Sequence, residues 1–152
     1  MANMIYEFKT HSIYYDSNYL YNTFSLTIDT LELFFELVTG KFIGIQGFFP
    51  LIQAKKCKLN LPQVERCKEY YLEDVSGYKL GIAYDLIVKI PQTRMYFENL
   101  VIKFDKEKGI IQVGSNPKHD DVIYKINENI ILIFDFQNIL KCIFIMPSFF
   151  LN

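Results

Sequence analysis

A regular series of acidic residues is the most prominent cluster of charged side chains in the sequence. Glu65, Glu69 and Glu73 follow one another at positions i, i+4 and i+8, and Asp74 extends the series. On a helix this spacing places the glutamates on one face, where like charges are mildly unfavourable. Such a face is either an ordinary solvated surface or one that imitates phosphate charge and blocks the basic active site of another protein. The second interpretation makes all four acids candidate partner-binding residues.

Residues with catalytic potential are sparse. His119 stands beside Asp120 and Asp121, and the other histidine is His11. The loop around His119 has neither the ligand set of a structural zinc site nor the central glycine of a calcium loop, so a solvated turn explains it. No nucleophile elbow and no phosphate-binding glycine loop occurs. We therefore expect a non-enzyme without metal or cofactor, and keep an enzyme site at 119–121 as an alternative.

The cysteines, the net charge and the hydropathy narrow the class of protein. Three cysteines at 57, 67 and 142 fit neither a disulfide framework nor a Cys-X-X-Cys metal or redox site. A net charge of -1, with the densest basic cluster limited to three lysines, argues against nucleic-acid binding. The most apolar stretch, 130–150, contains Asp135 and Lys141 and is too polar to span a membrane. Because the N-terminus has no signal-peptide pattern, we expect a cytoplasmic protein.

The hydrophobic pattern predicts a mainly β protein that positions these residues. Apolar residues alternate most clearly over 78–90, and a second strand is expected over 95–104. A helix is expected over 62–75, where apolar residues recur at helical spacing opposite the acids. Its apolar stripe consists of Val64, Cys67, Tyr71 and Val75. The expected fold class is therefore α+β, with an antiparallel, meander-rich sheet and one covering helix.

The chain has no linker or low-complexity segment, so we expect one domain over 1–152. Two candidate half-repeats, 13–50 and 102–147, lie within it. The aligned pairs include Phe34 with Ile131, Phe42 with Ile139 and Ile13 with Ile102. Identity between the halves is nearly nil, and any two buried hairpins share such a pattern. A duplicated fold and an undivided sheet are both compatible with it.

Two pairs of phenylalanines stand beside prolines where strands are expected to end. Phe48 and Phe49 precede a proline, and Phe149 and Phe150 follow one. Neighbouring residues on a strand point to opposite faces of the sheet, so either both faces are covered or one is exposed. Packing in the core explains these pairs, and an exposed partner site is the other interpretation. Phe48 and Phe49 are therefore further candidate partner-binding residues.

The small size, the absence of catalytic motifs, the acidic series and the turn-strand run 38–50 together resemble the small bacterial immunity proteins of toxin delivery systems, such as contact-dependent growth inhibition. The resemblance carries over no family residues. It implies a non-catalytic protein that occludes the active site of a cognate protein toxin, such as a nuclease, through charge and shape complementarity. It leaves the oligomeric state open. The alternative function is a small-molecule-binding β-barrel, which a cavity of roughly several hundred Å³ would favour.

Overall fold

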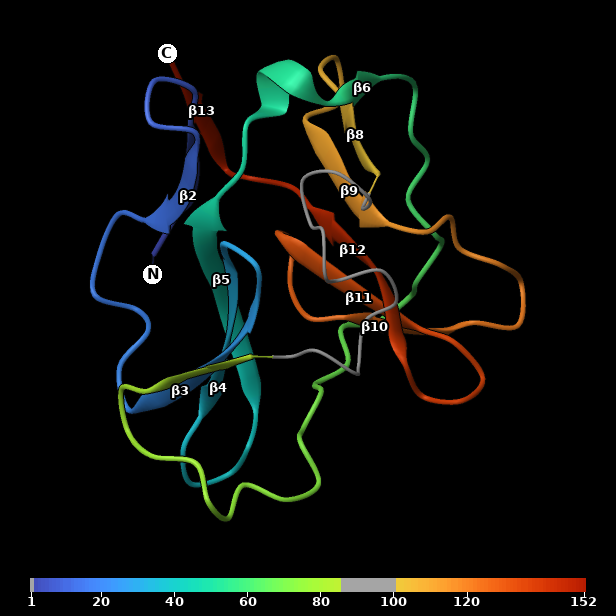
Figure 1. The fold of residues 1–152 in the computed structure, drawn as a ribbon. Coiled ribbons are helices and arrows are strands. Elements are labelled where there is room, and N and C mark those ends of the chain that lie inside the picture. Colours follow the sequence, from blue (N-terminus) through green and yellow to red (C-terminus); the bar gives the residue numbers. More distant parts are fainter. Residues whose placement is uncertain (1, 86–100) are drawn as a thin grey trace.

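The computed structural model describes residues 2–85 and 101–152 and shows two β-sheets around a shared core (Figure 1). In the seven-stranded sheet the order is β13 (Phe149–Leu151), β1 (Met4–Glu7), β2 (Ser12–Tyr15), β5 (Phe42–Phe48), β4 (Leu31–Glu36), β3 (Thr23–Ile28) and β7 (Ala83–Asp85). In the six-stranded sheet the order is β10 (Val122–Lys125), β11 (Ile130–Phe134), β12 (Leu140–Ile145), β9 (Ile110–Gly114), β8 (Ile102–Asp105) and β6 (Lys55–Lys56). The prediction of a mainly β protein is thus confirmed.

Both sheets are mixed, so the prediction of an antiparallel sheet is wrong in this respect. Most neighbouring strands are antiparallel, but β13 runs parallel to β1, β6 to β8 and β7 to β3. In each of these pairs the chain enters the sheet from elsewhere in the fold, so no tight hairpin fixes an antiparallel direction.

The predicted covering helix over 62–75 is also wrong. The described residues contain no α-helix, and their one helical segment is the 3-10 turn η1 (Leu51–Gln53). The chain after β6 instead bonds to strand edges of both sheets. These bonds run from the Lys68 amide to the Lys125 carbonyl (2.8 Å), from the Phe42 amide to the Tyr70 carbonyl (2.8 Å) and from the Leu72 amide to the Gly40 carbonyl (2.9 Å).

Pairing with these edges replaces a helix that would be weak by itself. A short helix is marginal in water, and like charges four residues apart weaken it further. The strand edges offer its backbone groups partners that an isolated segment lacks.

The described part of the chain also contains no helix that is long and apolar enough to cross a membrane.

Two predicted strands fall partly outside the residues that the structure describes. Of the strand predicted over 78–90, the structure shows β7, and residues 86–90 lie outside its description. Of the strand predicted over 95–104, it shows the end as part of β8, and residues 95–100 lie outside.

The two sheets repeat one strand order and one pairing register. The order β1-β2-β5-β4-β3 in one sheet matches β8-β9-β12-β11-β10 in the other. Matching pairs include Tyr6–Ile13 with Phe104–Ile111 and Leu33–Ile45 with Leu132–Ile143. The strand that follows each set of five along the chain lies in the other sheet. β6 follows β5 but pairs with β8, and β13 follows β12 but pairs with β1.

The register observed in the two hairpins differs from the alignment made on the sequence. It matches Phe34 with Ile133 instead of Ile131, Phe42 with Leu140 instead of Ile139, and Ile13 with Ile111 instead of Ile102. Matching inner-face positions then hold the same residue in four pairs: Ile13 and Ile111, Leu33 and Leu132, Phe35 and Phe134, and Ile45 and Ile143. The sequence alignment is thus shifted by two residues in β4, by one in β5 and by nine in β2, and each shift conceals the identities at equivalent positions. The one-residue shift in β5 also exchanges the two faces of that strand.

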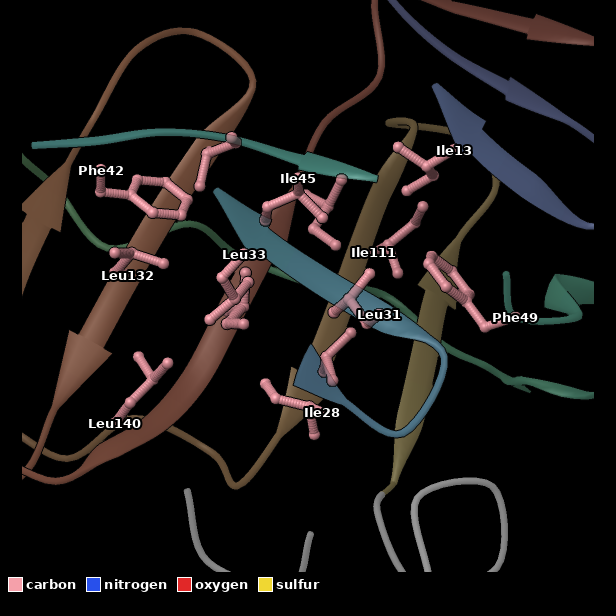
Figure 2. Close-up of a cluster of buried hydrophobic side chains, with 14 of the residues drawn as sticks. Ile13, Ile28, Leu31, Leu33, Phe42, Ile45, Phe49, Ile111, Leu132 and Leu140 are labelled. Atoms are coloured by element: carbon pink, nitrogen blue, oxygen red, sulfur yellow. The ribbon is translucent and has the colours of Figure 1, made fainter. Parts of the chain in front are cut away.

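The inner faces of both sheets build the main core (Figure 2). Leu33 and Ile45 from the seven-stranded sheet lie among Ile111, Leu132 and Leu140 from the other sheet, and all five are buried. A second buried cluster belongs to the opposite face of the six-stranded sheet. Its members are Leu59, Ile110, Ile131, Ile133, Cys142 and Phe144.

Candidate functional site

The acidic series does not form a ridge, because the segment that carries it is not helical. Its members Glu65, Glu69, Glu73 and Asp74 are all exposed. Glu69 is held individually: its carboxylate accepts a hydrogen bond from the Tyr71 hydroxyl and lies 3.5 Å from Lys41 Nζ. These two contacts, the hydrogen bond first, hold the pKa of Glu69 below its usual value. The acids are therefore exposed along a segment without helical structure, and not along the face of a helix as predicted.

In the loop at 119–121, one acid is paired with a lysine and the other two side chains are exposed. Asp121 Oδ2 lies 2.9 Å from Lys141 Nζ, in an ion pair whose side chains are 3% and 9% exposed. Burial raises the pKa of Asp121, but the Lys118 amide and the Lys141 ammonium lower it by more, so that it falls below its usual value. His119 and Asp120 are exposed. Within residues 2–85 and 101–152, no three metal-ligating side chains come together.

Phe48 and Phe49 have opposite environments. Phe49 is fully buried, with its ring centroid 5.5 Å from that of Tyr6, and its carbonyl accepts a hydrogen bond from the Tyr6 hydroxyl (2.5 Å). Phe49 therefore belongs to the core, and its prediction as a partner-binding residue does not match this placement. Phe48, the last residue of β5, is 59% exposed.

Phe48 takes part in an exposed apolar surface on the outer face of the seven-stranded sheet. The register places it in one row with Ser12, Glu7 and Leu151, while Ile5, Tyr14 and Phe149 form the adjacent row. Phe149 and Leu151 are 53% and 42% exposed. We define the outer-face patch as Ile5, Tyr14, Phe48, Phe149 and Leu151. Near its centre the Tyr14 hydroxyl donates to Glu7 Oε1 (2.8 Å).

A cavity of about 520 Å³ lies between the two sheets, on the inner side of the seven-stranded sheet. Its apolar walls come from β3, β4, β11 and β12, and consist of Leu26, Leu33, Phe35, Leu132, Phe134 and Leu140. The segment between β6 and β7 (residues 57–82), which we call the crossing segment, contributes Tyr70, Leu72 and Tyr78 to the lining. The cavity is thus shared by both sheets and by the segment that the sequence predicted as a helix.

The aromatic rings of the cavity are fixed by neighbouring rings. Tyr70 stacks on Phe134, with 4.7 Å between the ring centroids, and Tyr78 stacks on Phe24 at 4.3 Å. Burial, followed by the nearby Tyr124 and Glu73, raises the pKa of the Tyr70 hydroxyl. Tyr70 therefore stays neutral and presents an uncharged ring to the cavity.

Tyr70 and Leu72 are not among the site residues predicted from the sequence. Both are half-buried, whereas Glu69, Tyr71 and Glu73 between and around them are exposed. This alternation with a period of two is typical of an extended segment with one side against the protein. It is visible in the sequence, but the helical pattern of the acids overlaps it.

Comparisons with known proteins return no match to the chain, whether by family model, by curated protein sequence or by solved structure. The outer-face patch and the cavity are therefore the features from which a function can be inferred.

Proposed function

We propose that this protein is a non-catalytic binding protein that docks on a cognate protein toxin and occludes its active site. The observation that carries the proposal is the outer-face patch, where Phe48 on β5 and Phe149 and Leu151 on β13 remain exposed on one face of the sheet. Ile5 and Tyr14, on the two strands between them, complete the patch. Contiguous exposed apolar side chains typically mark a site for a protein partner. Large aromatic side chains are also the residues that most often dominate binding energy at protein interfaces.

The edge strand β13 extends this surface to the backbone. It is the outermost strand of the seven-stranded sheet, and among the described strands only β1 pairs with it. An unpaired strand edge presents amide and carbonyl groups that an extended segment of a partner can join. Phe149 and Leu151 leave this edge apolar, whereas many exposed edges are protected by charged residues.

Glu7 adds a charge to the outer-face patch that a basic active site would meet. It lies between Ser12 and Leu151 in one row of the sheet, and its carboxylate accepts a hydrogen bond from Tyr14. A toxin such as a nuclease carries basic groups for its substrate, so a carboxylate within an apolar rim suits it. This replaces the acidic series as the proposed source of charge complementarity.

The proposal is tested with the purified product of the neighbouring reading frame as the partner. We expect a complex of one copy each by light scattering, and inhibition of the partner's activity. Phe48→Ser combined with Phe149→Ser should weaken binding at least about tenfold in calorimetry, because two exposed anchors are lost. The matched control is Val38→Ser, which removes an apolar side chain that is 82% exposed in the turn between β4 and β5. It should bind like the unchanged protein.

Two results would reject the proposal at different levels. Equal binding by the double variant and the Val38→Ser control would show that the outer-face patch is not the docking surface. Absence of any complex with the neighbouring product would reject the inhibitor function itself.

One observation favours the alternative function, small-molecule binding: the cavity of about 520 Å³. As far as residues 2–85 and 101–152 show, the cavity lies between two sheets and not inside one closed barrel.

A further inference from the structure

We propose that the cavity between the two sheets binds a small organic cation with an aromatic or apolar body, of the arylalkylamine class. This goes beyond the docking function, because the cavity and the outer-face patch lie on opposite faces of the seven-stranded sheet. Leu26 and Leu33 face the cavity, whereas Phe48 and Phe149 face outward. The two sites are therefore testable separately.

The size and walls of the cavity suit an apolar body. Protein interiors are close-packed, and gaps larger than a water molecule are few. A volume of about 520 Å³ lies within the range of small-molecule sites, which extends over roughly 300–1,000 Å³. Leucine and phenylalanine side chains from both sheets form most of its walls. Burying an apolar ring against them removes its surface from water.

The aromatic lining suits a ring that carries a positive charge. Tyr70, Tyr78 and Tyr84 all line the cavity. Tyr84 packs edge-on against Tyr78, with 5.0 Å between centroids and 72° between ring planes, so both rings are held in place. The faces of such rings attract cations, and they also accept stacking by another aromatic ring.

The charged side chains of the lining determine which sign of charge the cavity favours in a ligand. Glu73, Asp74 and Asp85 line the cavity, and no Lys, Arg or His among the described residues does so. Hydrogen bonds from the Ser76 hydroxyl and amide hold the pKa of Asp74 below its usual value, so Asp74 is ionised at neutral pH. Asp85 Oδ1 accepts a hydrogen bond from the Thr27 hydroxyl (3.0 Å).

Two nearby lysines have partners outside the cavity. Lys41 lies beside Glu69, and Lys68 lies over the ring of Tyr124 at 4.4 Å from its centroid. The lining therefore keeps a net negative charge next to apolar walls. A ligand of this class places its ammonium group near the carboxylates and its apolar body against the leucines and tyrosines.

The test compares two probes that share one ring and differ in charge. Tryptamine carries an ammonium group at neutral pH, and indole-3-propionate carries a carboxylate. Calorimetric titration of the full chain should give saturable binding of tryptamine, with indole-3-propionate at least about fivefold weaker. Saturable binding of neither probe, or equal affinity for both, would overturn the proposal.

Variants then locate the binding. Glu73→Gln with Asp85→Asn should weaken tryptamine about fivefold, as expected for partly solvated ion pairs, and should not weaken indole-3-propionate. The matched control Glu65→Gln neutralises an exposed acid of the same segment that does not line the cavity, and should leave binding unchanged. Equal weakening by the control would show a general charge effect and overturn the proposed site.

A variant that fills the cavity separates this site from other apolar surfaces. Leu72→Trp places a larger side chain at the lining and should abolish binding of both probes, with its folding confirmed by circular dichroism. Undiminished tryptamine binding in a folded Leu72→Trp variant would contradict the proposal. The patch variant Phe48→Ser with Phe149→Ser should still bind tryptamine, so failure of the docking function and failure of the cavity site are distinguishable.

Discussion

The outer faces of the two sheets differ at positions that the pairing register makes equivalent. The pair Glu32–Gln46 in the seven-stranded sheet corresponds to Ile131–Phe144 in the six-stranded sheet. Ile131 and Phe144 are each 1% exposed, whereas Glu32 and Gln46 are partly exposed. Inner-face positions, by contrast, are apolar in both sheets and in four pairs identical.

This contrast separates two requirements on a strand. The inner face must fill the core that both sheets share, so its composition is fixed by the fold. The outer face depends on what lies against it, so one sheet carries a second apolar cluster and the other carries polar residues with the outer-face patch. At these equivalent positions, the outer face of the seven-stranded sheet is thus the more exposed of the two.

The largest expected effect comes from exchanging outer-face residues between the sheets. Phe144→Gln should lower the free energy of unfolding by about 4 kcal/mol, because it removes a buried ring and buries an amide without a partner. The reciprocal Gln46→Phe should change it by less than about 0.5 kcal/mol. Urea unfolding followed by circular dichroism measures both. Similar effects of the two substitutions would contradict the difference between the outer faces.

A smaller effect is expected at the bulges of the two hairpins. The bulge residue is Ile43 in one hairpin and Lys141 in the other, and Asp121, which pairs with Lys141, corresponds to Thr23. Lys141→Ile should destabilise by about 2 kcal/mol, because it leaves the charge of Asp121 unpaired. The double variant Asp121→Thr with Lys141→Ile has the residue types found at Thr23 and Ile43. In a double-mutant cycle it should regain most of the free energy of unfolding that Lys141→Ile alone loses.

The same ion pair predicts a dependence on pH. The pKa of Asp121 is lower in the folded protein than its usual value, so its contribution to stability is present above that usual value and is lost as pH falls through the folded pKa. Acid unfolding of the double variant should lack this contribution and be less steep below about pH 4. An unchanged acid profile would show that Asp121 does not contribute to acid unfolding.

A still smaller effect tests the contact between the crossing segment and the first hairpin. Gly40 and Asn138 hold matching turn positions with positive φ of 78° and 63°. A Cβ atom at Gly40 would lie 2.8 Å from Val75 Cγ1 and 2.9 Å from the Leu72 carbonyl oxygen. Gly40→Asn should therefore destabilise by about 1 kcal/mol, and Asn138→Gly by less than about 0.5 kcal/mol, in thermal unfolding. Equal losses of stability in the two variants would show that the crossing segment does not pack against Gly40.

The smallest effect on stability is expected at the two exchanged edge strands. β6 carries Lys55 and Lys56, whereas the equivalent β13 carries exposed Phe149 and Leu151. Phe149→Lys with Leu151→Lys makes β13 resemble β6 and should change the free energy of unfolding by less than about 0.5 kcal/mol. The same variant should lose partner binding in size-exclusion chromatography. A loss of stability above about 1 kcal/mol would show that these residues serve packing and not docking.

Much of the fold was predictable because strand formation follows a local pattern. The alternation of apolar residues predicts a mainly β chain, and the paired phenylalanines point to Phe48, which the structure leaves exposed. The segment at 62–75 was wrongly predicted because its acids repeat every four residues while Tyr70 and Leu72 follow a period of two. Bonds to Lys125 and Gly40, far away in the sequence, decide between the two patterns.

The alternation of apolar residues is enough to predict a strand-rich chain and many of its core positions, because side chains alternate along a strand wherever it pairs. Only the folded structure fixes the register between the two five-strand sets, the exchange of β6 and β13, and the exposure of one outer face. It also decided that Tyr70 and Glu73 meet Leu33 and Leu132 around one cavity. These properties depend on contacts between residues far apart in the chain, and a local sequence pattern does not specify such contacts.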